Sequence, residues 1–238
     1  MTRTVKSIQP AATPVRVDLE DIALHGDLVV PEHALGLVIF VHGSGSSRFS
    51  PRNKYVAGKL NNAGLATLLL DLLTDEEQRI DTETMEFRFN IPLLGARSTL
   101  VASWASHKPE LSRLPIGLFG ASTGAAAALI TAAAMKGQVA AVVSRGGRAD
   151  MAEDALDKVE CPTLLIVGGD DESVVELNEQ AMARMHCPTK LHIVPGATHL
   201  FEEPGTLEQV ATVAAEWFVE HMLSATSREE GSPRKRPA

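Results

Sequence analysis

The sequence predicts an α/β fold in which a mainly parallel sheet is covered by helices on both faces. Apolar runs of strand length alternate with segments of helical spacing from residue 35 to residue 223. This alternation is typical of parallel connections, because a crossover helix carries the chain back to the same edge of the sheet. The length of 238 residues suits a single domain with a full hydrophobic core.

The first two strands are expected to be antiparallel, and the later ones parallel. Segments 15–19 and 22–30 alternate apolar and polar side chains, which is typical of half-buried strands. The run at 35–41 is continuously apolar, as in a strand buried on both faces. Further strands are expected at 65–72, 114–119, 139–143, 163–167 and 191–194, and helices at 51–63, 91–106, 125–135, 174–185 and 207–223.

One segment interrupts the alternation of strands and helices. Residues 74–88, TDEEQRIDTETMEFR, are too polar and acidic for the core and follow directly after a strand. We expect a surface insertion there, either a small or partial lid or a contact in a homodimer. The domain itself is expected to span residues 15–223, after an N-terminal extension over 1–14 and before a flexible tail over 224–238.

Composition favours a small molecule as the partner of this chain. A net charge of -8 and a pI near 5.5 argue against nucleic acid, whose binding depends on cationic side chains. The N-terminus has no apolar stretch typical of a secretory signal, and no segment is apolar for long enough to cross a bilayer. We therefore expect a cytoplasmic protein without a membrane partner. The histidines show no metal-ligand spacing, so neither a metal nor another cofactor is expected.

The pentapeptide GASTG at 120–124 carries the strongest chemical signal in the chain. It has the form G-x-S-x-G and lies between an apolar strand and an alanine-rich helix. In that context the motif is typical of a sharp turn that presents a serine hydroxyl above the edge of a sheet. Ser122 is therefore the candidate nucleophile, and a close-packed turn with an idle serine is the alternative.

Two later loops supply the partners that a nucleophilic serine needs. A serine hydroxyl must lose its proton to a base, which in turn needs a carboxylate to orient it. Asp170 and Asp171 follow the strand TLLIVG, and His199 follows the strand LHIVP in a glycine-containing loop. The chain order Ser, Asp, His favours a catalytic triad. We predict His199 as the base and Asp171, in preference to Asp170, as the acid.

The loop HGSGSS at 42–47 follows a buried strand and is a candidate oxyanion hole. Acyl transfer places negative charge on a carbonyl oxygen, which two backbone N–H groups must stabilise. We expect these donors at Ser44 and at Thr123, the residue after the nucleophile. The alternative, a phosphate-binding loop, lacks the lysine of the P-loop pattern.

With these motifs, the chain resembles the α/β-hydrolase superfamily and specifically its dienelactone-hydrolase-like branch. The stretches HGSGSSRFSPRN, DLLTDEEQ, SRGGR and PGATHLFEEPGTLE are similar to its short members, some of which occur fused to phosphoribosyltransferase domains. The resemblance covers about residues 15–223 and implies the triad and oxyanion hole described above. Dienelactone hydrolase proper carries a cysteine nucleophile, so the serine here implies an esterase or lactonase with a different substrate.

Several arginines are expected at the same sheet edge as the nucleophile. Arg48 follows the oxyanion loop, and Arg145 and Arg148 follow the strand AAVVS. Arginine binds carboxylate and phosphate well, so these residues favour an anionic substrate, although salt bridges within the protein would explain them equally well.

The leading function is therefore hydrolysis of small carboxylic esters or lactones through an acyl-enzyme. Acyl transfer, thioester hydrolysis and peptide cleavage use the same triad and remain alternatives, because the fold does not determine the substrate. A non-catalytic ligand-binding protein is less favoured, since such a protein would be expected to have lost part of the triad.

Overall fold

The computed structural model describes residues 11–231, with side chains described up to residue 227. An eight-stranded sheet forms its centre, in the order β1-β2-β4-β3-β5-β6-β7-β8. The two pairings made by β2 are antiparallel and the other five are parallel, so the predicted α/β-hydrolase fold with a mainly parallel sheet is confirmed. The strands are β1 (Thr13–Asp18), β2 (Ala23–Val29), β3 (Leu37–Val41), β4 (Ala66–Leu70), β5 (Ile116–Ala121), β6 (Val139–Arg145), β7 (Thr163–Gly168) and β8 (Thr189–Val194).

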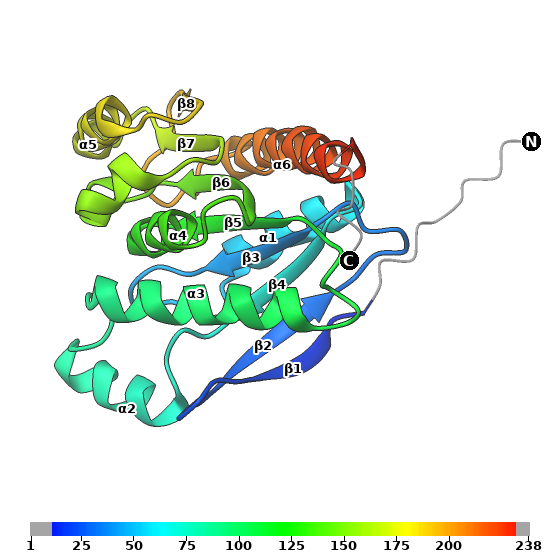
Figure 1. Cartoon of the computed structure of the whole chain (residues 1–238). Helices are drawn as coiled ribbons and strands as arrows, with labels where there is room; N and C mark the ends of the chain where they lie inside the picture. Colours follow the sequence, from blue (N-terminus) through cyan, green and yellow to red (C-terminus); the bar gives the residue numbers. More distant parts are fainter. Residues whose placement is uncertain (1–10, 232–238) are drawn as a thin grey trace, which may run out of the picture.

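Helices cover both faces of the sheet (Figure 1). One face packs against α3 and α4, and the opposite face packs against α1 and α6. Every residue of β3, β4, β5 and β7 is buried, and so is every residue of β6 except Ala140, which explains why these sequences are largely apolar. The helices are α1 (Pro51–Asn62), α2 (Asp75–Thr84), α3 (Ile91–His107), α4 (Thr123–Ala134), the 3-10 segment η1 (Ala149–Lys158), α5 (Glu172–Arg184) and α6 (Thr206–Gly231).

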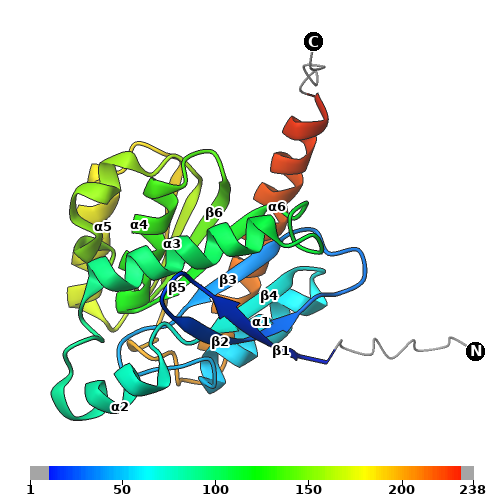
Figure 2. The same cartoon turned by 60° about the horizontal axis from the view of Figure 1, so that its bottom comes forward.

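The structure differs from the expected domain boundaries at both ends. β1 begins at Thr13, two residues before the expected start of the domain. At the other end, α6 continues to Gly231, so the prediction of a flexible tail beginning at residue 224 was wrong for 224–231. No glycine or proline lies between Leu223 and Gly231 to end the helix earlier. The last turns of α6 extend away from the sheet in Figure 2, and 1–10 and 232–238 lie outside the described residues.

The acidic insertion contains a helix that we did not predict. Thr74 caps α2: its hydroxyl accepts from the backbone N–H of Glu77, and the Glu77 carboxylate accepts from the backbone N–H of Thr74. This reciprocal capping box satisfies two backbone donors, and three acidic residues in the first turn interact favourably with the helix dipole. The polarity of the segment therefore reflects an exposed helix.

The chain has two cysteines, Cys161 and Cys187. Both cysteines are free. Burial, and to a smaller extent the nearby Cys187, raises the pKa of Cys161 to about 12.

Among the described helices, none has the length and apolar composition that a membrane span requires.

Gly124, in the first turn of α4, has the least room for a side chain next to the backbone among the described glycines. A Cβ at this position would lie 2.2 Å from the carbonyl oxygen of Val41 and 2.5 Å from that of His42. Both are backbone atoms at the end of β3, so they cannot move aside without disturbing the sheet. Only glycine allows α4 to approach β3 this closely.

Gly124→Ala is therefore expected to lower the free energy of unfolding by about 3 kcal/mol, because the added methyl group overlaps fixed backbone atoms. Urea denaturation measures this change. Gly169→Ala is the control, since its new Cβ would meet its nearest neighbour at 3.3 Å. Equal stability of the Gly124→Ala variant and the wild type would contradict the prediction.

Candidate active site

Ser122 occupies the sharp turn between β5 and α4. Its backbone has φ 50° and ψ -124°, a conformation that is strained for any residue other than glycine. Gly120 permits the turn, because a Cβ there would lie 2.4 Å from the Cα of Ala125. The structure thus supplies the strand, turn and helix that the G-x-S-x-G motif predicts.

His199 lies next to Ser122, as the sequence predicts. Its Nε2 is 3.3 Å from the Ser122 Oγ, and its Nδ1 is 2.7 Å from the Asp171 Oδ2. The carboxylate accepts the Nδ1 proton, which leaves Nε2 free to accept the serine proton. The three residues come from the carboxyl ends of β5, β7 and β8, which meet at one edge of the sheet.

Asp171, not Asp170, is the acid that contacts the histidine. Its side chain is 14% exposed, whereas Asp170 is an exposed residue at the end of β7. The backbone N–H of Asp170 donates to the carbonyl of Ala197, and this bond fastens the β7 loop to the β8 loop. Asp171 is the N-cap residue of α5, but its side chain makes no capping hydrogen bond there, and its Oδ2 is the atom closest to the His199 Nδ1.

The loop that carries His199 is fixed on both sides of the histidine. The Glu203 carboxylate accepts hydrogen bonds from the backbone N–H and the hydroxyl of Thr198, at 3.1 and 2.7 Å. Phe201 is fully buried despite a positive φ of 55°. Gly146 packs against this loop, and a Cβ there would lie 3.1 Å from the His199 carbonyl oxygen.

The two predicted oxyanion residues are in direct contact. The Ser44 backbone N–H donates to the Thr123 hydroxyl at 2.8 Å. In this state the Ser44 amide already has an acceptor, so a substrate oxyanion must share or replace that bond. Gly43 keeps the loop close to the nucleophile, because a Cβ there would lie 3.0 Å from the Ser122 Cβ.

His42, the first residue of the oxyanion loop, connects this loop to the segment that follows β4. It is buried, and its Nε2 accepts from the backbone N–H of Leu72 at 3.0 Å. Nδ1 therefore carries the proton and donates to the Gly43 carbonyl at 2.9 Å. Burial lowers the pKa of His42, which keeps the ring neutral.

Acid is expected to destabilise the protein through His42. Because the pKa is lowered in the folded state, the unfolded chain binds this proton at a higher pH. The stabilisation is fully present above the ordinary pKa of 6.5 and falls below it, by at most about 1.4 kcal/mol per pH unit, down to the folded-state pKa. Urea unfolding at several pH values between about pH 7 and pH 5 gives the free energy of unfolding as a function of pH. This free energy should fall less steeply with decreasing pH for His42→Gln than for the wild type. The same pH dependence in both proteins would contradict this assignment.

The α2 insertion is anchored next to the oxyanion loop. Arg97 of α3 donates to the Glu77 carboxylate at 2.7 Å, and Arg88 donates to the fully buried Asp81 at 2.7 Å. A small cavity lies between the insertion and the oxyanion loop, lined by His42, Gly43, Ser44, Gly45, Ser46, Leu73, Gln78, Asp81, Arg88 and Leu94. The insertion thus forms a wall beside the candidate site.

The three predicted arginines have different surroundings. Arg48 forms ion pairs with Asp71 and Asp27, and Arg148 donates to both carboxylate oxygens of Asp150. Arg145 is buried, and in the described part of the chain it forms no ion pair with a carboxylate. Two of the three guanidinium groups are therefore neutralised by carboxylates of the protein itself, and Arg145 is left as the candidate for an external anion.

Comparison with known proteins agrees with this geometry. The profile of the dienelactone hydrolase family matches residues 24–226. The chain belongs to this family. It is 52% identical over 222 residues to two proteins of Mycobacterium tuberculosis, each named "Putative phosphoribosyl transferase", covering 91% of this chain and 49% of theirs. The chain therefore spans about half the length of these curated relatives.

Solved structures of other proteins share the fold. A dienelactone hydrolase from Anabaena variabilis is 52% identical, with a TM-score of 0.88 over 90% of this chain and 99% of that one. Est1E from Butyrivibrio proteoclasticus is 19% identical, with a TM-score of 0.75 over 88% of this chain and 99% of that one. The family profile and the Anabaena variabilis structure support hydrolase activity for this chain, and Est1E shares its fold.

Proposed function

We propose that this chain is a serine hydrolase that cleaves small carboxylic esters or lactones. The observation that carries the proposal is the continuous hydrogen-bonded arrangement of Ser122, His199 and Asp171 on a strained turn. An idle serine in a packed turn would need neither a histidine at its hydroxyl nor a carboxylate behind that histidine.

The proposed reaction follows the geometry of these three side chains. His199 accepts the Ser122 proton while the serine oxygen attacks the substrate carbonyl, and Asp171 stabilises the resulting imidazolium. The tetrahedral oxyanion accepts hydrogen bonds from the backbone N–H groups of Thr123 and Ser44. Collapse of this intermediate releases the alcohol with the proton from His199 and leaves an acyl-enzyme. Water, deprotonated by His199, then releases the acid.

The curated relatives are named as phosphoribosyl transferases, although the family of this chain is a hydrolase family. This chain matches 49% of those proteins, and the family profile of a hydrolase covers residues 24–226 of it. We infer that the transferase named for the relatives belongs to the half of their length that this chain does not match.

A panel of short p-nitrophenyl esters and simple lactones tests the proposal. Pre-steady-state measurement should show a burst of p-nitrophenol equal to the enzyme concentration if deacylation is slow. A fluorophosphonate should attach to Ser122, as located by peptide mass spectrometry. Failure of the protein both to hydrolyse any member of the panel and to react with the fluorophosphonate would refute the proposal.

Acyl transfer uses the same acyl-enzyme, and the same assay distinguishes it from hydrolysis. If the enzyme is a hydrolase, an added alcohol should compete with water for the acyl-enzyme, and the fraction of transfer product should rise only in proportion to the alcohol concentration. A transferase would instead show little turnover until the acceptor is present.

A further inference from the structure

Arg145 is a buried cation without an anionic partner. It ends β6, its side chain is on the α1 and α6 face of the sheet, and the residue is only 5% exposed. Its Nη2 donates to the Asn53 Oδ1 at 3.3 Å, and its Nε has no hydrogen-bond acceptor. A charge buried beside one neutral amide is unfavourable, because it has lost water without gaining a counter-ion.

A second arginine lies beside it. Arg52, in the first turn of α1, donates to the Glu202 carboxylate at 3.1 Å, while its Nε is also buried without an acceptor. Burial, and then the charge of Arg52, lower the pKa of Arg145 to about 10. The Arg145 guanidinium is therefore still positive at neutral pH, and the charge of Arg52 acts against it.

The N-terminus of α1 adds to this positive potential. The helix is 12 residues long, and its first turn contains Arg52 and Asn53 but no acidic residue. Pro51 has no N–H and the Ser50 hydroxyl accepts from the Asn53 N–H, so the helix dipole is the main contribution of this end to binding an anion. Glu202, the acid that pairs with Arg52, has a side chain that is 65% exposed.

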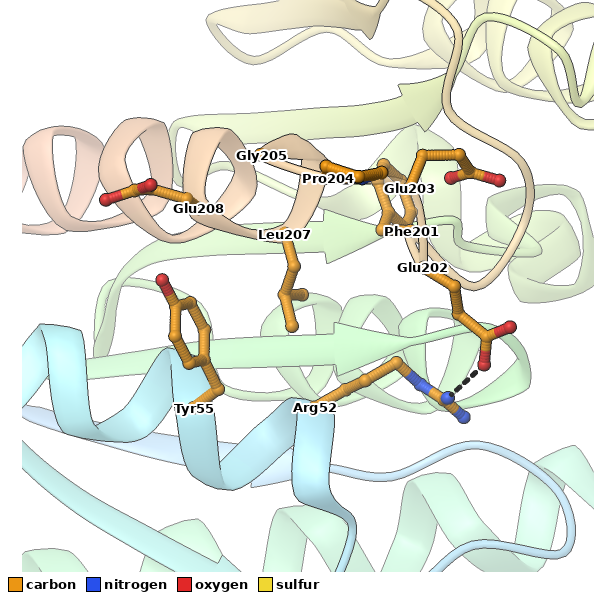
Figure 3. Close-up of a pocket in the computed structure, with 9 residues that line it drawn as sticks. All are labelled: Arg52, Tyr55, Phe201, Glu202, Glu203, Pro204, Gly205, Leu207 and Glu208. Carbon is orange, nitrogen blue, oxygen red and sulfur yellow. Dashed lines mark hydrogen bonds and ion pairs between the residues drawn. The ribbon is translucent and has the colours of Figure 1, made fainter.

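Arg52 lines a groove beside the loop that carries His199, whereas Arg145 and Asn53 are buried and are not among the residues that line it. Figure 3 shows Arg52 and Tyr55 on one wall, Leu207 opposite them, and Glu202 at the open end, bonded to Arg52. The groove has a volume of about 470 Å³. The Arg145 guanidinium is 5.9 Å from the ring centre of Phe201, which lines the same groove.

We propose that Arg145, Arg52 and the Asn53 amide form a binding site for a small oxyanion, either a carboxylate or a phosphate group. In the free protein the Glu202 carboxylate pairs with Arg52, and it turns outward into solvent when the ligand binds. The two guanidinium groups supply the planar paired donors that such oxyanions prefer.

The site lies next to the candidate nucleophile along the backbone. Arg145 pairs with Ala121 in the sheet, and its carbonyl oxygen accepts from the backbone N–H of Ser122 at 3.2 Å. The oxyanion is either a group carried by the hydrolysed substrate or a separate ligand. Only the first of these sources rests on the proposed function.

Inorganic phosphate is the probe for a thermal-unfolding test on the full chain. Phosphate at about ten times its dissociation constant should raise the Tm of the wild type by about 4 °C. Arg145→Met and Arg52→Gln should each lose at least half of this rise. Arg79→Gln is the matched control, because Arg79 is exposed and paired with Glu76, and it should retain the whole rise.

The Tm without phosphate separates a ligand site from a purely structural role for Arg145. Removing an unpaired buried charge should leave the Tm of Arg145→Met equal to or above that of the wild type. A lower Tm combined with an unchanged phosphate effect would overturn the proposal, as would equal phosphate effects in all four proteins. If Arg145→Met does not fold, calorimetric titration of Arg52→Gln with phosphate decides, and affinity less than about fourfold weaker overturns the proposal.

Kinetics identify the source of the oxyanion. If the group belongs to the substrate, phosphate should compete with a carboxylated ester, and Arg52→Gln should raise KM for that ester but not for a neutral ester of equal size. If phosphate binds without competing, the ligand is separate, and the site still stands. An inactive wild type would refute the proposed hydrolase while the Tm and titration results remained valid for the oxyanion site.

Discussion

Ser122→Ala is expected to lower kcat/KM for a short p-nitrophenyl ester by about 10⁴- to 10⁶-fold, because no other atom can form the acyl-enzyme. The Oγ removed by this change is the atom that lies 3.3 Å from the His199 Nε2. Labelling by a fluorophosphonate should disappear together with turnover. Stopped-flow kinetics and gel fluorescence measure the two effects.

Ser112→Ala is the matched control for this variant. Ser112 is exposed and precedes β5, so it lies at the opposite edge of the sheet from the triad. Its hydroxyl donates only to the carbonyl of Pro109, at 3.4 Å. The control should keep wild-type turnover, and the Ser122→Ala variant should keep the wild-type unfolding curve. Substantial turnover in folded Ser122→Ala would mean that another residue is the nucleophile.

The second large effect is expected at Asp171. Asp171→Asn should lower kcat by about 10⁴-fold, because an amide can donate to Nδ1 and so favour the tautomer that carries its proton on Nε2. That tautomer cannot accept the Ser122 proton. The side chain has nearly the same shape, so the unfolding curve should change little while kcat falls.

Asp170→Asn provides the comparison that the chain itself offers. Asp170 is exposed, and its bond to the β8 loop is made by its backbone N–H, which the substitution leaves intact. Its kcat should stay within about twofold of the wild type. A loss at Asp170 as large as that at Asp171 would show that the hydrogen bond to His199 is not the contact that matters for catalysis.

The strand pattern and the site loops were predictable because they depend on local sequence and on one topological rule. Each of the eight predicted strands is present, and the loops after β5, β7 and β8 meet because parallel strands share a carboxyl edge. The prediction that Ser122, Asp171 and His199 lie together needed only that rule. The T-x-x-E pattern from Thr74 to Glu77 is the signal in the sequence from which α2 can be predicted.

The surroundings of the arginines could not be predicted in the same way. The partner of Arg48 is Asp71, which comes 23 residues later in the chain, and no periodicity connects the two. Arg145 and Asn53 are 92 residues apart in the chain, and no sequence pattern connects them. Charge pairing depends on which side chains the sheet and helices bring together, so the same residue type is neutralised at one strand end and unpaired at another.

The close packing of Gly124 against the end of β3 divides the site into parts of unequal local stability. Ser122, Thr123 and the oxyanion loop are held by backbone contacts between β3 and α4, whereas the His199 side chain is 38% exposed and held by one carboxylate. Under mild denaturant the His199 loop should open before the sheet does. Amide hydrogen exchange would then show early opening at 196–203, and enzymatic inactivation would precede global unfolding.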